Sequence, residues 1–339
     1  MNIRAGIDVG GAHLKVAIAD GTRLVAVQQF RCRLWLGLEK LDTALRKAAP
    51  MLANAKSIAV TMTGELSDVF PDRTVGVETI VRRITAEFGE GVRFWIGPRG
   101  LGAASDALAH TRDVGSTNFL ATAAFAARTH ADALVIDFGS TTADIIPIRD
   151  GRAIPAGLTD ATRQTTGELV YTGYSRTAVM GVATRAPFRG KWVTLAREYL
   201  ATMADVRRIL GTDLSEIDQQ ATADGKDKSV ESSIVRLARM LGRDASEGSF
   251  EDWQTVAAYV REEQLRSVHD GTLQVISRAA LPRSAPVIAA GIGAPDVAGI
   301  GARLNRRVIP FAELAGAPPE LATWATACAP AVSLALFQD

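Results

Sequence analysis

The chain has 339 residues, 47% hydrophobic and 22% charged, a composition typical of a globular protein with an ample core. Its 38 basic and 37 acidic residues give a net charge of +1, so it lacks the basic excess typical of proteins that bind nucleic acid or membrane surfaces. With two distant cysteines, Cys32 and Cys328, and no apolar leader, we expect a cytoplasmic protein with reduced thiols.

The first third of the chain predicts a compact α/β unit. Strands are expected over residues 3–9, 14–19 and 24–30, and a helix from residue 38 that Pro50 ends. A strand over 57–63, a helix over 77–88 and a strand over 92–96 follow, and residues 97–115 are read as loop. We therefore predict a first domain over residues 1–117, completed by a C-terminal helix within 320–339.

The remainder predicts a second α/β unit over residues 118–319. A helix of small residues is expected over 118–130, two strands over 133–136 and 145–148, and loop from 149 to 167. Residues 192–277 are read as mostly helical, so a helical insertion is placed at about 190–278, with Trp192 and Trp253 in its core and a solvated loop at 222–228. A strand, a helix and a strand over 286–311 precede the closing helix, whose apolar part is shorter than the ~20 residues of a membrane span.

The stretch from Ala133 to Gly151 predicts a phosphate-binding hairpin. Its first strand ends at Asp137, and the turn that follows is rich in glycine and hydroxyl groups: Gly139, Ser140, Thr141 and Thr142. Glycine lets backbone N–H groups approach an anion, hydroxyls add donors, and a carboxylate at the strand end can hold hydrated Mg²⁺. An ordinary tight turn uses the same residues, so this hairpin alone is weak evidence.

The N-terminus repeats this pattern. Asp8 also closes an apolar strand and is followed by Gly10 and Gly11, so that IDVGG matches IDFGS. The repeat suggests two domains of common design that face each other, with a phosphate site between them.

These features resemble the actin-like superfamily (ASKHA proteins, with ribonuclease H-like domains). Two acid–glycine hairpins, a small-residue helix between them and a later strand followed by Gly291-Ile292-Gly293 occur in the order that this superfamily shows. The resemblance implies a two-domain α/β fold with a helical insertion. It also implies that both hairpins bind phosphate, that Asp8 and Asp137 hold Mg²⁺, and that Gly291 and Gly293 lie near a nucleotide base.

Five segments resemble a narrower group, the hydantoinase/oxoprolinase-like proteins tied to tetrahydromethanopterin-linked one-carbon transfer. They are DVGGAHLKVA, VTMTGELSDVF, IDFGSTTADIIPI, GELVYTGYSRTAV and TADGK. A characterised archaeal member acts in methanofuran biosynthesis, where it joins an aminomethyl-furan-methyl diphosphate to the phenol oxygen of γ-glutamyl-tyramine and releases diphosphate. The resemblance implies an ether-forming transferase of methanofuran or methylofuran synthesis.

The first hairpin departs from the actin-like kinases at His13 and Lys15, where those enzymes usually carry small hydroxyl residues. The ammonium of Lys15 is a point charge that can bind phosphate oxygens. It suits a bound diphosphate as well as ATP, and this departure from the kinase pattern puts the use of ATP in doubt.

The proposed chemistry needs a base, because a phenol of pKa ~10 is a better nucleophile as phenolate. Glu65 is our first candidate, beside Thr63 and Gly64 at a strand end, with Asp144 and His13 as competitors. Each has a structural alternative: a helix cap for Glu65, a solvated hairpin face for Asp144, and a turn for His13. Substrate contacts are predicted for Thr63, Gly64, Tyr171, Thr172 and Arg176, with Arg176 binding a carboxylate.

Two further classes of function remain open at this point. One is an ATP-dependent kinase or hydantoinase-like amidohydrolase that uses the same hairpins, and the other is a non-enzymatic nucleotide-binding switch. The expected partners are a furan diphosphate and a phenolic acceptor, without nucleic acid or membrane, and a homodimer is left open.

Overall fold

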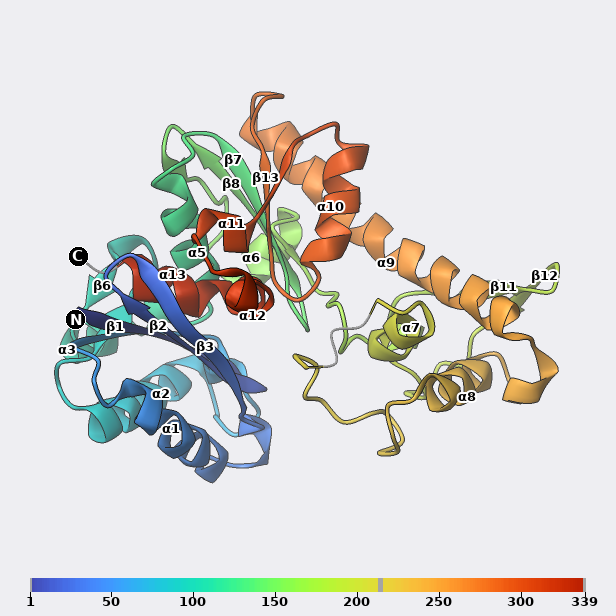
Figure 1. Cartoon of the computed structure of the whole chain (residues 1–339), viewed down its shortest axis with the longest axis horizontal. Helices are drawn as coiled ribbons and strands as arrows, with labels where there is room; N and C mark the ends of the chain where they lie inside the picture. Colours follow the sequence, from blue (N-terminus) through green and yellow to red (C-terminus); the bar gives the residue numbers. More distant parts are fainter. Residues whose placement is uncertain (1, 213–215, 338–339) are drawn as a thin grey trace.

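The computed structural model describes residues 2–212 and 216–337. Two mixed β-sheets with helices on both sides form the body of the molecule, and a smaller lobe extends from it (Figure 1). The two termini lie close together beside the first sheet.

The first sheet has the strand order β3-β2-β1-β4-β5-β6. β1, β2 and β3 are antiparallel, β4 and β5 run parallel to β1, and β6 is antiparallel to β5. Helices α1 and α2 cover one face with an apolar core. The elements are β1 (Ile3–Val9), β2 (His13–Asp20), β3 (Arg23–Arg31), β4 (Ser57–Met62), β5 (Arg93–Trp95), β6 (Leu101–Gly102), α1 (Glu39–Leu52) and α2 (Arg73–Phe88).

The second sheet has the order β10-β8-β7-β13-β14, with β9 paired to β8. β7 and β8 form an antiparallel hairpin, and β13 and β14 run parallel to β7. Helices α9 and α10 cover one face. The elements are β7 (Ala133–Phe138), β8 (Ala143–Arg149), β9 (Arg152–Ala153), β10 (Leu169–Val170), β13 (Val287–Ala290), β14 (Val308–Pro310), α9 (Phe250–Ala279) and α10 (Ala294–Arg303).

The two sheets share one design, as the repeated hairpin motif predicts. In each, an antiparallel hairpin that turns at the acid–glycine motif is followed by two strands parallel to its first strand. The predicted domain boundaries, at residue 117 and around the insertion, stay predictions.

Helices α5 (Asn118–Ala127) and α13 (Ala329–Phe337) pack between the two sheets in a shared core. Small residues allow this close packing, and at Gly6 a Cβ atom would lie 1.9 Å from the carbonyl oxygen of Ala331. The closing helix is predicted to be continuous, but it is broken: Pro319–Ala327 and Ala329–Phe337 meet at a bend of 107°. No single helix in the described ranges is long and apolar enough to cross a membrane. The bent pair, taken together, has the length and composition of a membrane span.

The smaller lobe contains the hairpin of β11 (Arg185–Phe188) and β12 (Lys191–Thr194), α7 (Met203–Ile209), α8 (Val230–Met240) and the start of α9. These elements share a core with the buried Trp253, as predicted. Trp192 was predicted to be buried as well, but it is 56% exposed on β12, where its ring packs against Tyr259. The predicted helical block therefore includes a β-hairpin, whose short strands give too little periodicity to be recognised.

Three local predictions are wrong. Pro50 lies inside α1, near its end, and α1 continues to Leu52 although proline removes an N–H donor and crowds the carbonyl of the preceding turn. The segments read as loop contain α3 (Ala104–Ala109), α4 (Thr111–Val114) and α6 (Asp160–Thr165), which are too short to show helical periodicity. The remaining short helices are η1 (Leu34–Leu36), η2 (Gly64–Leu66), η3 (Gly97–Arg99), η4 (Val179–Gly181), η5 (Ala245–Glu247), α11 (Phe311–Leu314), η6 (Pro319–Leu321) and α12 (Ala322–Ala327).

Candidate active site

Strand alternation directs the charged residues of both hairpins toward the space between the sheets. Side chains two residues apart share a face. Ala17 on β2 and Val135 and Ile146 on the second hairpin belong to the core between the sheets. Lys15, Asp137 and Asp144 each lie two residues from one of these core residues, so they share its face of the strand. On β1, Asp8 lies two residues from Gly6, which packs on α13, and therefore shares the face of Gly6.

In the first hairpin, Asp8 and Lys15 lie opposite each other across β1 and β2. Lys15 Nζ is 3.5 Å from Asp8 Oδ2. Asp8 is 2% exposed, and its other oxygen, Oδ1, has no hydrogen-bond partner among the described residues. The hairpin therefore brings an ion pair and one unsatisfied carboxylate oxygen to the end of β1.

In the second hairpin, Asp137 and Asp144 are the directly opposed pair. Asp144 is paired with Arg163, whose Nη2 is 2.8 Å from Asp144 Oδ1. Asp144 is thus neither a solvated residue nor a free carboxylate. Within residues 2–212 and 216–337, no arginine pairs with Asp137, which lies close enough to Lys15 for the two charges to interact.

Both turns close on themselves through their first glycine. Gly10 N donates to His13 O and Gly139 N donates to Thr142 O, each at 2.9 Å. These two N–H groups are therefore engaged within the turns. Among the described residues, no backbone acceptor engages the N–H groups of Gly11 and Ser140, so each turn retains at least one donor for an anion.

The carboxylates of the two hairpins oppose one another's ionisation. Burial raises the pKa of Asp137 to about 7, and the charges of Asp144 and Asp8 add to this increase while Lys15 counteracts it. Burial also raises the pKa of Asp8. For Lys15, burial by itself favours the neutral amine, but the carboxylates of Asp8 and Asp137 raise its pKa above the ordinary value, so its ammonium is charged.

This arrangement fits a Mg²⁺ ion that is completed by phosphate and water. In the described part of the chain, no three His, Cys, Asp or Glu side chains are grouped to hold a metal. Mg²⁺ needs only one or two carboxylates when a substrate supplies phosphate oxygens. The unsatisfied Oδ1 of Asp8 and the mutual repulsion of Asp8, Asp137 and Asp144 both favour an added cation.

Two adjoining cavities open beside the hairpins. A small one of about 20 Å³ is lined by His13, Lys15, Gly139 and Ser140, which brings the two turns together at one site. A larger one of about 510 Å³ lies between the first sheet, the second hairpin and the lobe. Three residues line both cavities: Ser175, Asp218 and Gln220. Ser175 is buried, and its hydroxyl has no partner among the described residues.

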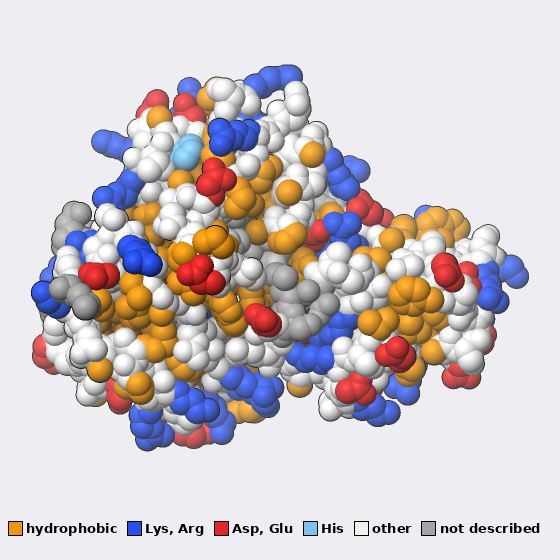
Figure 2. Space-filling view, viewed as in Figure 1, with side chains coloured by type: hydrophobic (Ala, Val, Ile, Leu, Met, Phe, Trp, Pro, Cys, Tyr) orange, Lys and Arg blue, Asp and Glu red, His pale blue; other side chains and the backbone are white. Residues whose placement is uncertain are grey.

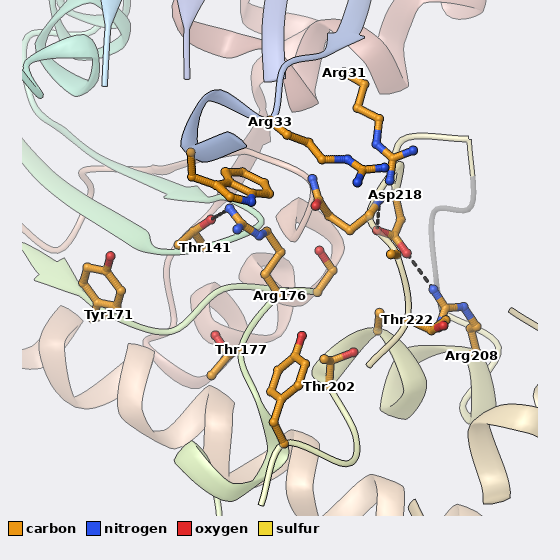
Figure 3. A pocket seen from close by; sticks show the side chains of 16 residues that line it. Arg31, Arg33, Thr141, Tyr171, Arg176, Thr177, Thr202, Arg208, Asp218 and Thr222 are labelled. Carbon is orange, nitrogen blue, oxygen red and sulfur yellow. Dashed lines mark hydrogen bonds and ion pairs between the residues drawn. The ribbon is translucent and has the colours of Figure 1, made fainter. Parts of the chain in front are cut away.

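The larger cavity is basic and partly aromatic (Figure 3). In the space-filling view, Lys and Arg side chains also gather where the lobe meets the body (Figure 2). Arg176 donates to Thr141 Oγ1 at 3.1 Å and lies 5.5 Å from the centre of the Trp35 ring. The basic residues of the lining are Arg31, Arg33, Arg176 and Arg208, and the aromatic ones are Trp35, Tyr171 and Tyr199.

Glu65 is buried at the end of β4 and lines neither cavity. Ser116 Oγ donates to its Oε1 at 2.6 Å, and Arg73 Nε lies 3.9 Å away. Burial raises the pKa of Glu65 to about 7, a value suited to a base at neutral pH. Glu65 does not cap α2, because the capping side chain there is Asp72.

His13 is a weak base in this structure. It is 7% exposed, and its Nε2 lies 3.0 Å from Gln220 Nε2 on the lobe side of the site. Burial and the charges of Lys15 and Arg176 lower its pKa to about 3. The imidazole is therefore neutral at physiological pH and is poorly suited to deprotonate a phenol.

The predicted substrate residues lie in three places. Tyr171 and Arg176 line the larger cavity, whereas Thr172 is buried and accepts a hydrogen bond from Gln264 of α9 at 2.9 Å. Thr63 and Gly64 follow β4 beside the end of β1, where Thr63 N donates to Val9 O at 2.9 Å. Thr172 thus contacts α9 and not the cavity.

Packing accounts for Gly291 and Gly293. A Cβ on Gly291, whose φ is +80°, would lie 2.4 Å from Asp137 Oδ1, and one on Gly293 would lie 2.5 Å from the Phe138 ring. Gly293 N also donates to Phe138 O at 2.8 Å. These glycines let the start of α10 approach β7. This close packing explains why glycine is needed at both positions, whether or not a nucleotide base binds nearby.

Sequence reasoning missed several residues of the cavities. Arg31, Arg33 and Trp35 lie within five residues at the end of β3, and this cluster after a hairpin sheet is a signal that could have been used. Ser175 lies beside the second turn because its neighbours Tyr174 and Arg176 donate backbone hydrogen bonds to Gly139 O and Ser140 O, and this pairing has no local sequence signal. Gln220 reaches the first hairpin through its contact with His13.

Solved structures with the same architecture include a ROK family glucokinase from Streptomyces griseus in complex with glucose and AMPPNP, at a TM-score of 0.51 and 12% identity over 98% of both chains. Acetone carboxylase in its nucleotide-free form matches with a TM-score of 0.58 and 13% identity, over 98% of this chain and 70% of that one. These similarities establish an actin-like ATPase fold, as the sequence resemblance predicts.

Residues 56–304 match the profile of the Hydantoinase/oxoprolinase family, which is more than half of the chain, and the chain therefore belongs to this family. It is 34% identical over 240 residues to the (4-{4-[2-(gamma-L-glutamylamino)ethyl]phenoxymethyl}furan-2-yl)methanamine synthase of Methanocaldococcus jannaschii, covering 70% of this chain and 71% of that protein. The synthase of the same name from Methanococcus vannielii is 32% identical over 125 residues, covering 37% of this chain and 55% of that protein. Both relatives are synthases, and the chain is accordingly an enzyme.

Proposed function

We propose that this enzyme is a transferase of methanofuran-type cofactor synthesis. It joins the furan methyl carbon of an aminomethyl-furan-methyl diphosphate to the phenol oxygen of a tyramine- or tyrosine-type acceptor and releases diphosphate. The name of the relatives describes a product with this phenoxymethyl-furan linkage.

The observation that carries the proposal is the position of the two cavities. A site formed by both hairpins, with the ammonium of Lys15, adjoins a larger cavity that offers guanidinium groups and aromatic rings. The small cavity, at about 20 Å³, has room for about one water molecule, so diphosphate would lie where the two cavities join, with its oxygens directed toward Lys15. The phenolic acceptor suits the rest of the larger cavity. The two sites share Ser175, Asp218 and Gln220, so donor and acceptor would meet between them.

The chain's own residues supply positioning and charge neutralisation. Lys15 and the free N–H groups of Gly11 and Ser140 stabilise the negative charge that develops on the leaving diphosphate. Mg²⁺, when bound at Asp8 and Asp137, adds neutralisation of the same charge. The carbon–oxygen bond to diphosphate breaks as the phenol oxygen bonds to the furan methyl carbon, and the phenolic proton passes to a base.

Two carboxyl groups, the buried Glu65 and the half-buried Asp137, have a pKa of about 7, a value suited to that base. Glu65 is our proposed base. Because its carboxylate is hydrogen-bonded to Ser116 and lines neither cavity, either its side chain must move toward the acceptor or another group must relay the proton. Asp144 is held by Arg163, which disfavours it. Asp137 has a similar pKa but is assigned to the phosphate side of the site.

An ATP-dependent kinase or amidohydrolase is the alternative that the fold supports, because the S. griseus neighbour was solved with AMPPNP. The ion pair of Lys15 with Asp8 and the close packing around Gly291 and Gly293 favour a smaller diphosphate ligand.

The test offers the purified enzyme the furan diphosphate with γ-glutamyl-tyramine and Mg²⁺, and measures diphosphate release and the mass of the ether. A parallel reaction supplies ATP with Mg²⁺ and measures hydrolysis. We expect ether and diphosphate in equal amounts without ATP. Turnover of ATP with no ether from either a tyramine- or a tyrosine-type acceptor would overturn the proposal in favour of the ATP-dependent alternative.

A further inference from the structure

Arg31 and Arg33 form a pair of like charges in the wall of the larger cavity. Among the described residues, neither guanidinium has a carboxylate partner. Burial lowers the pKa of Arg31, and the two arginines are close enough that the charge of Arg33 lowers it further. Unpaired like charges at the edge of a cavity repel each other and favour an anion.

The other charged groups of the cavity are already engaged. Asp218 accepts from Arg208 Nη2 at 2.6 Å and from Lys228 Nζ at 3.2 Å. Arg176 has no carboxylate partner among the described residues, but its guanidinium donates to Thr141 and lies near the Trp35 ring. Arg31 and Arg33 are the lining arginines whose guanidinium groups make no hydrogen bond or ion pair with the described residues, so both remain available to a ligand.

Aromatic side chains complete the cavity. Trp35, Tyr171 and Tyr199 are 37%, 65% and 54% exposed, and all three line it. Exposed rings in a cavity offer faces and edges for the packing of another planar ring. The lining therefore fits a ligand that combines an aromatic ring with an anionic group.

We propose that Arg31 and Arg33 bind a carboxylate on the tail of the phenolic acceptor, while its ring lies among the aromatic residues nearer Thr141. This inference rests on the proposed function. A carboxylate and a phosphate present the same oxyanion chemistry to arginine. Arg31 and Arg33 lie on the side of the cavity away from Thr141 and the second hairpin, which favours the acceptor tail over the donor diphosphate (Figure 3).

The test compares the wild type, Arg31→Gln/Arg33→Gln and the control Arg23→Gln by titration calorimetry. Arg23 is an exposed arginine at the opposite end of β3 and does not line the cavity. The ligands are γ-glutamyl-tyramine, tyramine and inorganic diphosphate with Mg²⁺. We expect the wild type and the control to bind γ-glutamyl-tyramine about tenfold more tightly than tyramine, which corresponds to about 1.4 kcal/mol, because hydrogen bonds to charged groups are among the stronger ones. The double variant should lose this preference and keep its affinity for diphosphate.

Three results would overturn the inference. They are an unchanged preference in the double variant, an equal loss of both phenolic ligands, and a selective loss of diphosphate, which would assign the pair to the donor. Binding does not require turnover, so the calorimetry is independent of the ether assay. If the enzyme prefers the carboxylate ligand through Arg31 and Arg33 but forms no ether, the proposed binding site stands and the proposed reaction is wrong.

Discussion

Lys15 connects the two hairpins electrostatically. It pairs with Asp8, interacts with Asp137 and lines the small cavity beside the second turn. In the proposed reaction its charge is most valuable when the diphosphate departs, because negative charge then increases on the phosphate oxygens.

We predict that Lys15→Gln lowers kcat/KM for the furan diphosphate by about 10²-fold or more, the size of effect seen when one preorganised charge-stabilising donor is removed. The matched control is Lys56→Gln, because Lys56 is exposed at the opposite end of the first sheet, where its N–H pairs with Ile3 O. Steady-state diphosphate release measures both variants. Equal activity in the two would exclude Lys15 from the phosphate site.

Asp137 predicts a pH dependence of stability. Its folded-state pKa of about 7 exceeds the ordinary 3.8, so the native state binds more protons than the unfolded state between these values. Its contribution to stability is therefore full below about pH 4 and is lost as the pH rises through 7. We expect Asp137→Asn to flatten this decline in chemical denaturation without Mg²⁺. A variant with the same pH profile as the wild type would show that Asp137 is not the perturbed group.

Glu65 predicts a pH dependence of the reaction. If it is the base, turnover falls below pH about 7 as its carboxylate is protonated, and Glu65→Gln loses about 10²- to 10⁴-fold in kcat and this acidic limb. Glu87→Gln, at an exposed position of α2, is the control. Near-normal turnover of Glu65→Gln at all pH values would eliminate Glu65, whose pKa would then reflect burial alone.

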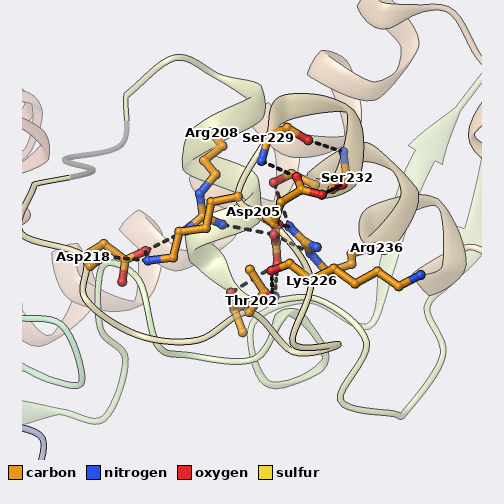
Figure 4. A network of polar contacts seen from close by, with 12 residues as sticks. Thr202, Asp205, Arg208, Asp218, Lys226, Ser229, Ser232 and Arg236 are labelled. Atoms are coloured by element: carbon orange, nitrogen blue, oxygen red, sulfur yellow. Dashed lines mark hydrogen bonds and ion pairs between the residues drawn. The ribbon is translucent and has the colours of Figure 1, made fainter.

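At the scale of elements, buried ion pairs join the lobe's helices to the segment that lines the cavity (Figure 4). Asp205 of α7 accepts from Arg236 of α8 at 2.8 Å and from Arg208 at 3.2 Å. Arg208 continues to Asp218, and the segment after Asp218 reaches the first sheet through Gln220 and His13. The network thereby fixes one wall of the proposed acceptor site.

We predict that Arg236→Met destabilises the protein by about 3–5 kcal/mol, because it leaves Asp205 buried without its main partner. Arg239→Met on the same helix is the control. Arg239 is 47% exposed and lies 4.0 Å from Asp224, so a change of about 0–1 kcal/mol is expected. Urea denaturation of the two variants provides the comparison. Similar stabilities would contradict a structural role for the buried network.

The elements differ in how far the sequence predicts them. The acid–glycine hairpins and the helix at Asn118 are recognised because their apolar runs and turns are local signals. β11 and β12 are missed because short strands carry little periodicity, and the break after Ala327 is missed because apolar residues continue through it. Among site residues, Asp8, Lys15 and Asp137 follow from the hairpins, whereas Ser175 and Gln220 depend on contacts distant in sequence.

At the scale of the whole molecule, the two sheets share the core built on α5 and α13, and the lobe closes the larger cavity from the side. The first sheet supplies Lys15 and Arg31 to the walls of the cavities, the turn of the second hairpin supplies Gly139 and Thr141, and the lobe supplies Tyr199 and Thr202. An enzyme that joins two substrates benefits from this arrangement, because the reacting atoms are held together away from bulk water.

In the proposed reaction, the phenol oxygen of the acceptor attacks the furan methyl carbon while diphosphate departs. An acceptor whose phenol oxygen carries a heavy-oxygen label tests this step when both products are examined by mass spectrometry. We expect all of the label in the ether, none in the diphosphate, and one diphosphate per ether without ATP. Label in the released diphosphate, or an ether that forms only when ATP is consumed, would overturn the proposed reaction.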